Sequence, residues 1–206
     1  MQNRSEMKLY GVRANRGGLQ YYEEHIHYTL DGTPDYIWRK VQAQVNSFDP
    51  ELNIKVPLEF VTSLCKFENL DEHQWLKADF KLPIVSKELV NIFLGIREMK
   101  HKLYPVIIRD EKNHEAINEN FVAFYLLEPF DCVDWSRTKL DQSNGQEYFN
   151  PQNAKYLSNL NYPPIFKINF VQNGKYSNLA HFVSESTKEK YIEYGITGVQ
   201  FEPPVG

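Results

Sequence analysis

The stretch that most constrains the fold lies near the C-terminal end of the chain. Residues 179–204 read as a short apolar strand, a capped helix, a glycine stop and a second strand. Ser186 is followed three residues later by Glu189, which is the spacing of a capping box at a helix N-terminus. Ser184 is the alternative cap for the same helix. The order of strand, helix and strand predicts architecture rather than chemistry.

Glycine marks the end of this predicted helix. Gly195 stands where a helix C-terminus favours a residue that tolerates positive φ. Residues 196–201 then resume an extended pattern, and we expect Pro203 and Pro204 to end the strand because proline has no N–H to donate to a sheet. The segment therefore predicts a helix closed on both sides by strands.

A second segment repeats this organisation earlier in the chain. Residues 82–86 form a short apolar run ending in Ser86, and residues 87–99 carry apolar side chains at helical spacing, including Leu89 and Phe93. The repetition predicts two similar strand-to-helix units, each with a serine cap.

The remaining apolar pattern indicates strands. Alternation or short apolar runs predict strands at residues 21–30, 56–64, 104–110, 120–127 and 165–171. The run at 120–127 is apolar enough to be central in a sheet. Residues 1–20 read as a loose polar lead-in, with Met7 as an alternative natural start, and residues 138–164 read as a long polar surface loop.

Composition narrows the fold class. The chain has 206 residues, 42% of them hydrophobic, with 13 Tyr and 13 Phe. This length can bury one substantial core, and the aromatic content suits a sheet-rich interior. We therefore expect a single α+β domain over residues 1–206, with a mainly antiparallel sheet and short serine-capped helices packed on it.

Charge, cysteine usage and hydropathy exclude several classes of protein. The net charge of −4, without a basic cluster, argues against nucleic-acid binding. Cys65 and Cys132 are far apart, so we expect free thiols rather than a disulfide framework or a thiolate metal site. No apolar run could span a bilayer and no signal peptide is visible, which predicts a cytoplasmic protein that does not bind membranes. Gly17 and Gly18 lack the spacing of a phosphate loop, and no cofactor is predicted.

One strand face offers a possible metal site. Alternation puts Glu23, His25 and His27 on the same side of the strand predicted at residues 21–30, and His-x-His can supply two zinc ligands. A small metal-dependent hydrolase is therefore the alternative function. A catalytic site would need a third ligand and an open coordination position, which one sequence does not identify, so a solvated strand face is the favoured interpretation.

An acidic and aromatic run enters the polar loop. Trp135 beside two carboxylates suits a protein-binding surface, because aromatic side chains supply contact area and acidic groups attract a basic partner. The alternative is a Trp135 buried in the core. The predicted partner-binding residues are Asp131, Asp134, Trp135, Glu147 and Tyr148.

Three blocks stand in order within residues 80–204. They are Leu82-Pro-Ile-Val-Ser86; then Tyr104-Pro-Val-Ile-Ile, Phe124-Tyr-Leu-Leu and Cys132-Val-Asp-Trp-Ser136; and last Phe182-Val-Ser-Glu followed by Tyr194-Gly-Ile-Thr-Gly-Val-Gln-Phe-Glu-Pro203. In this order they resemble the helix entry, the middle block and the C-terminal signature of a bacterial domain-of-unknown-function family classed among polymorphic-toxin immunity proteins.

The resemblance implies a function without catalysis. Such a protein would be a cytoplasmic, stoichiometric inhibitor that binds the effector domain of a cognate secreted toxin. The family supplies no catalytic residues, and residues 139–162 have no clear counterpart in its pattern. A structural or regulatory interaction module unrelated to any toxin is a further possibility.

Overall fold

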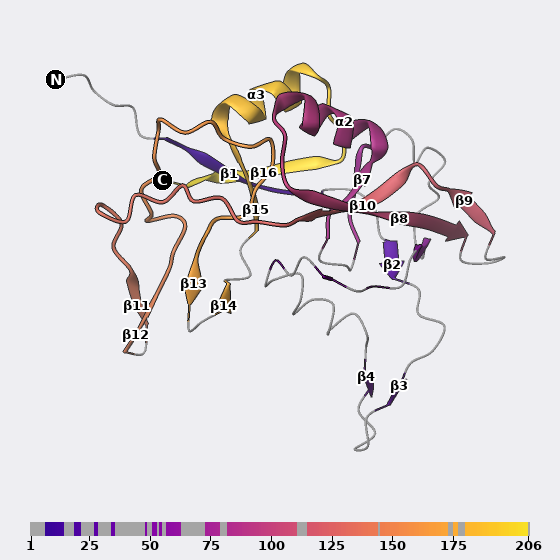
Figure 1. Ribbon diagram of the computed structural model, residues 1–206, viewed down its shortest axis with the longest axis horizontal. Helices are drawn as coiled ribbons and strands as arrows, with labels where there is room; N and C mark the ends of the chain where they lie inside the picture. Colours follow the sequence, from indigo (N-terminus) through magenta and orange to yellow (C-terminus); the bar gives the residue numbers. More distant parts are fainter. Residues whose placement is uncertain are drawn as a thin grey trace.

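The computed structural model describes most of the chain beyond residue 72 and shorter pieces before it. The described residues are 7–14, 19–21, 27–28, 34–35, 48, 51–52, 54, 57–62, 73–78, 82–110, 115–143, 145–172, 175–176 and 180–205. Figure 1 shows two neighbouring helices above extended strands, with hairpins projecting below them.

A three-stranded antiparallel sheet joins the beginning of the chain to its end. Strand β1 (Leu9–Ala14) lies between β15 (His181–Ser184) and β16 (Val199–Val205). The predicted loose lead-in at residues 1–20 is therefore wrong for β1, where Leu9, Tyr10 and Val12 are buried. This strand is held by partners about 170 to 195 residues away in sequence, so its order comes from long-range pairing.

Strand β16 also corrects the predicted role of its two prolines. The strand continues through Pro203 and Pro204 to Val205. It lies at an edge of its sheet and pairs with β1. An edge strand tolerates a residue that cannot donate on its open side, so the prolines do not end it.

A larger sheet contains the predicted central strand. Its order is β2 (Leu19–Tyr21), β5 (Leu58–Thr62), β8 (His101–Asp110), β10 (Phe121–Leu126), β7 (Ile84–Ser86) and β6 (Trp75–Leu76), with β9 (Ala116–Asn118) also paired to β8. Its pairs are antiparallel except β5 with β8. The predicted α+β class with mainly antiparallel sheets is confirmed.

Strand β10 explains why the core forms on both faces of this sheet. All six of its residues are buried. Phe121, Ala123 and Tyr125 pack into one apolar cluster, together with residues of β5 and β8. Val122, Phe124 and Leu126 pack into a second cluster, together with residues of both helices. A strand that is covered on both faces shows a continuous apolar run instead of alternation.

Both predicted strand-to-helix units are confirmed. Ser86 caps α2 (Lys87–Ile96), with its hydroxyl accepting from the Leu89 N–H at 3.1 Å. Ser184 caps α3 (Glu185–Glu193), accepting from the Thr187 N–H at 3.2 Å. The preferred cap, Ser186, is wrong: it lies inside the first turn, and its hydroxyl is 3.0 Å from that of Ser184.

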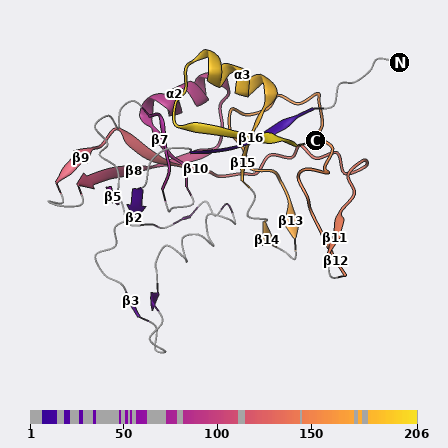
Figure 2. The same ribbon diagram turned by 180° about the vertical axis from the view of Figure 1, so that it is seen from behind.

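The two helices lie side by side on the same face of the molecule, as both views show (Figures 1 and 2). Phe93 of α2 stacks on Tyr191 of α3, with ring centroids 5.8 Å apart. Phe93 also meets Phe124 of β10 edge-on at 5.6 Å. These rings join the two units into one apolar layer.

Gly195 ends α3 at φ 63°, as predicted. Within the described residues no helix is long and apolar enough to cross a membrane.

Residues 138–164 are more ordered than the predicted surface loop. They contain a hairpin of β11 (Asp141–Ser143) and β12 (Gln146–Tyr148). Their aromatic side chains help to form a third core cluster, which also contains Leu9 of β1 and Phe182 of β15. The buried members from this segment are Phe149, Ala154, Tyr156 and Tyr162. The sequence did not predict these buried positions, because they follow no regular period and polar residues lie between them.

Other predicted strands are partly borne out. Residues 58–62 and 101–110 are strands, as expected. Residues 165–170 bury Phe166, Ile168 and Phe170 but make isolated bridges instead of a continuous strand. Most of the strand predicted at residues 21–30 lies outside the described residues. Two small hairpins join β3 (His27–Tyr28) to β4 (Pro34–Asp35) and β13 (Val171–Gln172) to β14 (Lys175–Tyr176).

Candidate functional site

Asp134 organises the turn that carries Trp135. Its carboxylate accepts from the Ser136 hydroxyl at 2.5 Å and from the Ser136 N–H at 3.2 Å. Its carbonyl accepts from the Thr138 N–H, and its own N–H donates to the Lys155 carbonyl at 2.8 Å. With 18% of its side chain exposed, Asp134 is committed to local bonds. It positions the turn that carries Trp135, and its predicted partner-binding role stays a prediction.

Trp135 is the exposed end of an aromatic stack. Its ring centroid lies 5.7 Å from that of Phe149 and 5.9 Å from that of Phe170. Phe149 and Phe170 themselves stack at 4.5 Å and are buried. Trp135 nevertheless keeps 46% of its surface exposed, so the core alternative for this residue is wrong. Two buried rings thus hold a third in place at the surface.

The hairpin next to this stack is held by amide groups. Asp141 accepts from Asn150 Nδ2 at 2.7 Å and from Asn153 Nδ2 at 2.8 Å. These bonds, with that of Asn150 first, lower the pKa of the Asp141 carboxyl. The contacts fix the start of β11 to the turn that follows β12. The sequence analysis missed this arrangement, because asparagine in a polar segment looks like any surface residue.

Two of the predicted partner-binding residues lie next to Phe149, Trp135 by ring contact and Tyr148 by sequence. Glu147 and Tyr148 are exposed on β12, and Tyr148 immediately precedes the Phe149 ring on which Trp135 packs. Asp131 is exposed and makes no hydrogen bond or ion pair to a described residue. Asp131, Trp135, Glu147 and Tyr148 therefore carry exposed acidic and aromatic groups within one segment of the chain. We call these four residues the hairpin surface.

Most of the alternative hydrolase site lies outside the described part of the chain. Glu23 and His25 lie outside the described residues, and His27 is described only as part of the backbone of β3. Among the described residues no three His, Cys, Asp or Glu side chains cluster in a way that could hold a metal ion.

Cys132 is a core thiol. It is fully buried and free of any disulfide. Burial, with the nearby Asp131 charge, raises its pKa to about 12. A thiol with this pKa stays protonated at neutral pH and is a poor nucleophile. The predicted free, buried thiol is confirmed at this position, whereas Cys65 lies outside the described residues.

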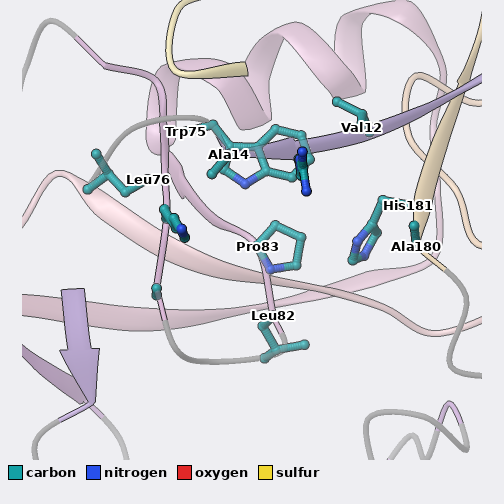
Figure 3. Close-up of a pocket in the computed structure, with 11 residues that line it drawn as sticks. Val12, Ala14, Trp75, Leu76, Leu82, Pro83, Ala180 and His181 are labelled. Carbon is teal, nitrogen blue, oxygen red and sulfur yellow. The ribbon is translucent and has the colours of Figure 1, made fainter. Parts of the chain in front are cut away.

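A cavity of about 260 Å³ lies where the two main sheets approach each other. Figure 3 shows the Trp75 indole, the Pro83 ring and the His181 imidazole around the same space, with Val12 and Leu82 at its ends. Trp75 is buried, and its indole meets the His181 ring edge-on at 6.4 Å. Burial, then the charge of Lys167, lowers the pKa of His181 well below 6.5. The imidazole is therefore neutral at pH 7.

Within the described part of the chain, the two charged residues that line this cavity are basic. Arg13 bonds through Nε to Glu202 at 3.3 Å, and 62% of its side chain is exposed. Lys77 is exposed and forms no ion pair with a described residue. The sequence analysis did not find this cavity, because its walls come from three segments that no motif connects.

No protein-family model matches the chain, and no curated protein matches it.

Proposed function

We propose that this chain is an immunity protein, which binds the effector domain of a cognate secreted polymorphic toxin and inhibits it stoichiometrically. It would act in the cytoplasm of the cell that makes the toxin, without turnover. The hairpin surface would carry the interface. The resemblance of residues 80–204 to the immunity family is one support, and the geometry of Trp135 is the other.

The observation that carries the proposal is that Trp135 is 46% exposed while two buried rings hold its indole in place. An aromatic ring that is half exposed but stacked on two buried rings loses little conformational entropy when a partner covers it. Tryptophan and tyrosine are also the residue types that most often dominate binding energy at protein interfaces. Tyr148, at 38% exposure, supplies a second aromatic group one residue from the stack. The hairpin surface therefore offers two exposed aromatic side chains to a protein partner.

Charge favours a basic partner. The whole chain has a net charge of −4, and Asp131 and Glu147 add exposed carboxylates to the hairpin surface. Complementary charge speeds association and disfavours wrong partners more than it adds affinity. We therefore expect the effector domain to present a basic surface around the groove that receives Trp135.

The direct test is titration calorimetry against the effector domain of the secreted toxin encoded beside this gene, used as a catalytically inactive variant. We expect saturable one-to-one binding with a dissociation constant of about 10 nM or tighter. Adding the chain to active toxin should abolish activity at equimolar ratio. Absence of binding between folded proteins would reject the immunity function.

The interface is tested by matched aromatic variants. Trp135→Ala should weaken binding by at least about 30-fold and Tyr148→Ala by about tenfold, as expected for central aromatic residues. Tyr194→Ala is the control, because Tyr194 is 51% exposed but follows helix α3, remote in sequence from the hairpin. Circular dichroism of each variant confirms that it is folded. If all three bind equally, the toxin binds another surface.

A further inference from the structure

We propose that the cavity between β1, β6 and β15 binds a small aromatic carboxylate, a planar ring that carries one negative charge. This site is separate from the hairpin surface and does not depend on the immunity function. Three observations support it: the shape of the walls, the sign of the charges and the hydrogen-bonding capacity of His181.

The walls suit a planar ring. Trp75, Pro83 and His181 present ring faces and edges to a single space (Figure 3). Aromatic rings favour stacked or edge-on contacts with other rings, and the half-buried His181 ring leaves surface for such a contact beside the buried Trp75 and Pro83. Strand pairing fixes Trp75 opposite Val85 of β7. The cavity volume of about 260 Å³ is below that of sites for drug-sized ligands, which begin near roughly 300 Å³, and suits one or two fused rings.

The charges select an anion. Among the described residues, Arg13 and Lys77 line the cavity and no carboxylate does. The bond from Arg13 Nε to Glu202 orients the guanidinium group, whose other N–H groups remain as donors. Lys77 supplies a second positive charge. The Glu202 carboxylate offsets part of the Arg13 charge, and Lys77 leaves the described lining positive, so a carboxylate would be attracted here and a cation repelled.

His181 adds a polar group without adding charge. A neutral imidazole offers one donor and one acceptor. Neither nitrogen of His181 is bonded to a described residue, although the ring lies in the cavity wall. A carboxylate oxygen of the ligand could accept from the imidazole N–H, and a ring N–H of the ligand could donate to the other imidazole nitrogen. Apolar walls with few convergent polar groups are the usual composition of a small-molecule site.

The test uses indole-3-acetate as probe, with the neutral indole-3-acetamide and the cationic tryptamine as matched analogues. Binding is followed by the NMR signal of the Trp75 indole N–H, assigned by elimination with the Trp38→Phe and Trp135→Phe variants. We expect indole-3-acetate to shift this signal saturably, with a dissociation constant on the order of 100 µM for a ligand of this size. The amide should bind about fivefold more weakly, and tryptamine should not bind.

Charge reversal then tests the anion site. Lys77→Glu should weaken indole-3-acetate binding by about tenfold, because an attractive charge becomes a repulsive one. Lys139→Glu makes the same change at an exposed position outside the cavity and should leave binding unchanged. The proposal is overturned if no probe shifts the Trp75 signal, if acid and amide bind equally, or if the two lysine variants behave alike.

Discussion

Gly198 lies against the main chain of Trp75 so closely that an added Cβ would overlap the Trp75 carbonyl oxygen. Its φ is 77°, a conformation that side chains other than glycine rarely adopt. Thr197 supports the same approach by donating its N–H to the side chain of Gln74 at 3.2 Å. The loop after α3 is thereby docked on the start of β6, and this contact joins the two sheets beside the cavity.

Gly198→Ala should therefore destabilise the protein. Backbone overlap and an unfavourable φ act together, and we expect the free energy of unfolding to fall by about 2–4 kcal/mol. Urea denaturation followed by circular dichroism measures the change. Because Trp75 forms a wall of the cavity, this variant should also broaden or shift the Trp75 indole signal.

Two other glycines provide the controls. An added Cβ on Gly195 meets no atom, so Gly195→Ala should cost only about 1 kcal/mol for its positive φ. Gly95 lies inside helix α2 with open space around it, so Gly95→Ala should stabilise the protein by about 0.5–1 kcal/mol. Equal effects at positions 195 and 198 would show that overlap with Trp75 is unimportant.

The capping serine of α3 can be identified by stability. Ser184 is buried and accepts from the Thr187 N–H, so Ser184→Ala leaves that donor without its partner. We expect a loss of about 1–2 kcal/mol in the free energy of unfolding. Ser186 is exposed, and Ser186→Ala should change stability by less than about 0.5 kcal/mol. A larger loss at position 186 than at 184 would restore the capping box.

Local signals in the sequence predicted the elements that depend on local interactions. Ser86 stands immediately before a helical apolar stripe, and its cap was predicted correctly. The apolar run of β10 indicated its central position. The cap of α3 was predicted wrongly, because two serines stand at the start of the predicted helix and only the pairing of β15 with β1 shows that the strand ends at Ser184.

The local sequence signals did not predict the features that depend on contacts between distant segments. Strand β1 is short and contains Gly11 and Arg13, so its sequence resembles a loop until β15 and β16 supply its partners. The hairpin surface was found as a set of residue types, but the commitment of Asp134 to its own turn depends on the Lys155 main chain. Contacts between distant segments create these features, and a single segment cannot reveal them.

Strand β1 should be essential for stability. Leu9 is fully buried in the third core cluster, so Leu9→Ala would leave a cavity and lower the free energy of unfolding by about 2–5 kcal/mol. Lys8 is exposed next to it, and Lys8→Ala should change stability by no more than about 0.5 kcal/mol. Thermal and urea unfolding of both variants measure the difference. Similar stability of the two would contradict a structural role for β1.

His181 should make stability depend on pH. Its pKa is lowered in the folded protein, first by burial and then by Lys167, whereas the unfolded chain binds this proton near pH 6.5. Below that pH the unfolded state holds more protons, so the free energy of unfolding falls as the pH falls.

The variant His181→Gln removes this proton-binding group. The stability of the wild-type chain relative to this variant should decline below about pH 6.5, by at most about 1.4 kcal/mol per pH unit. Above that pH the relative stability should be constant, because the imidazole is then neutral in both states. Urea denaturation of both proteins between about pH 5 and pH 8 measures it, and the other histidines cancel in the difference. A difference that is independent of pH would mean that His181 binds its proton equally well in the folded and unfolded chains.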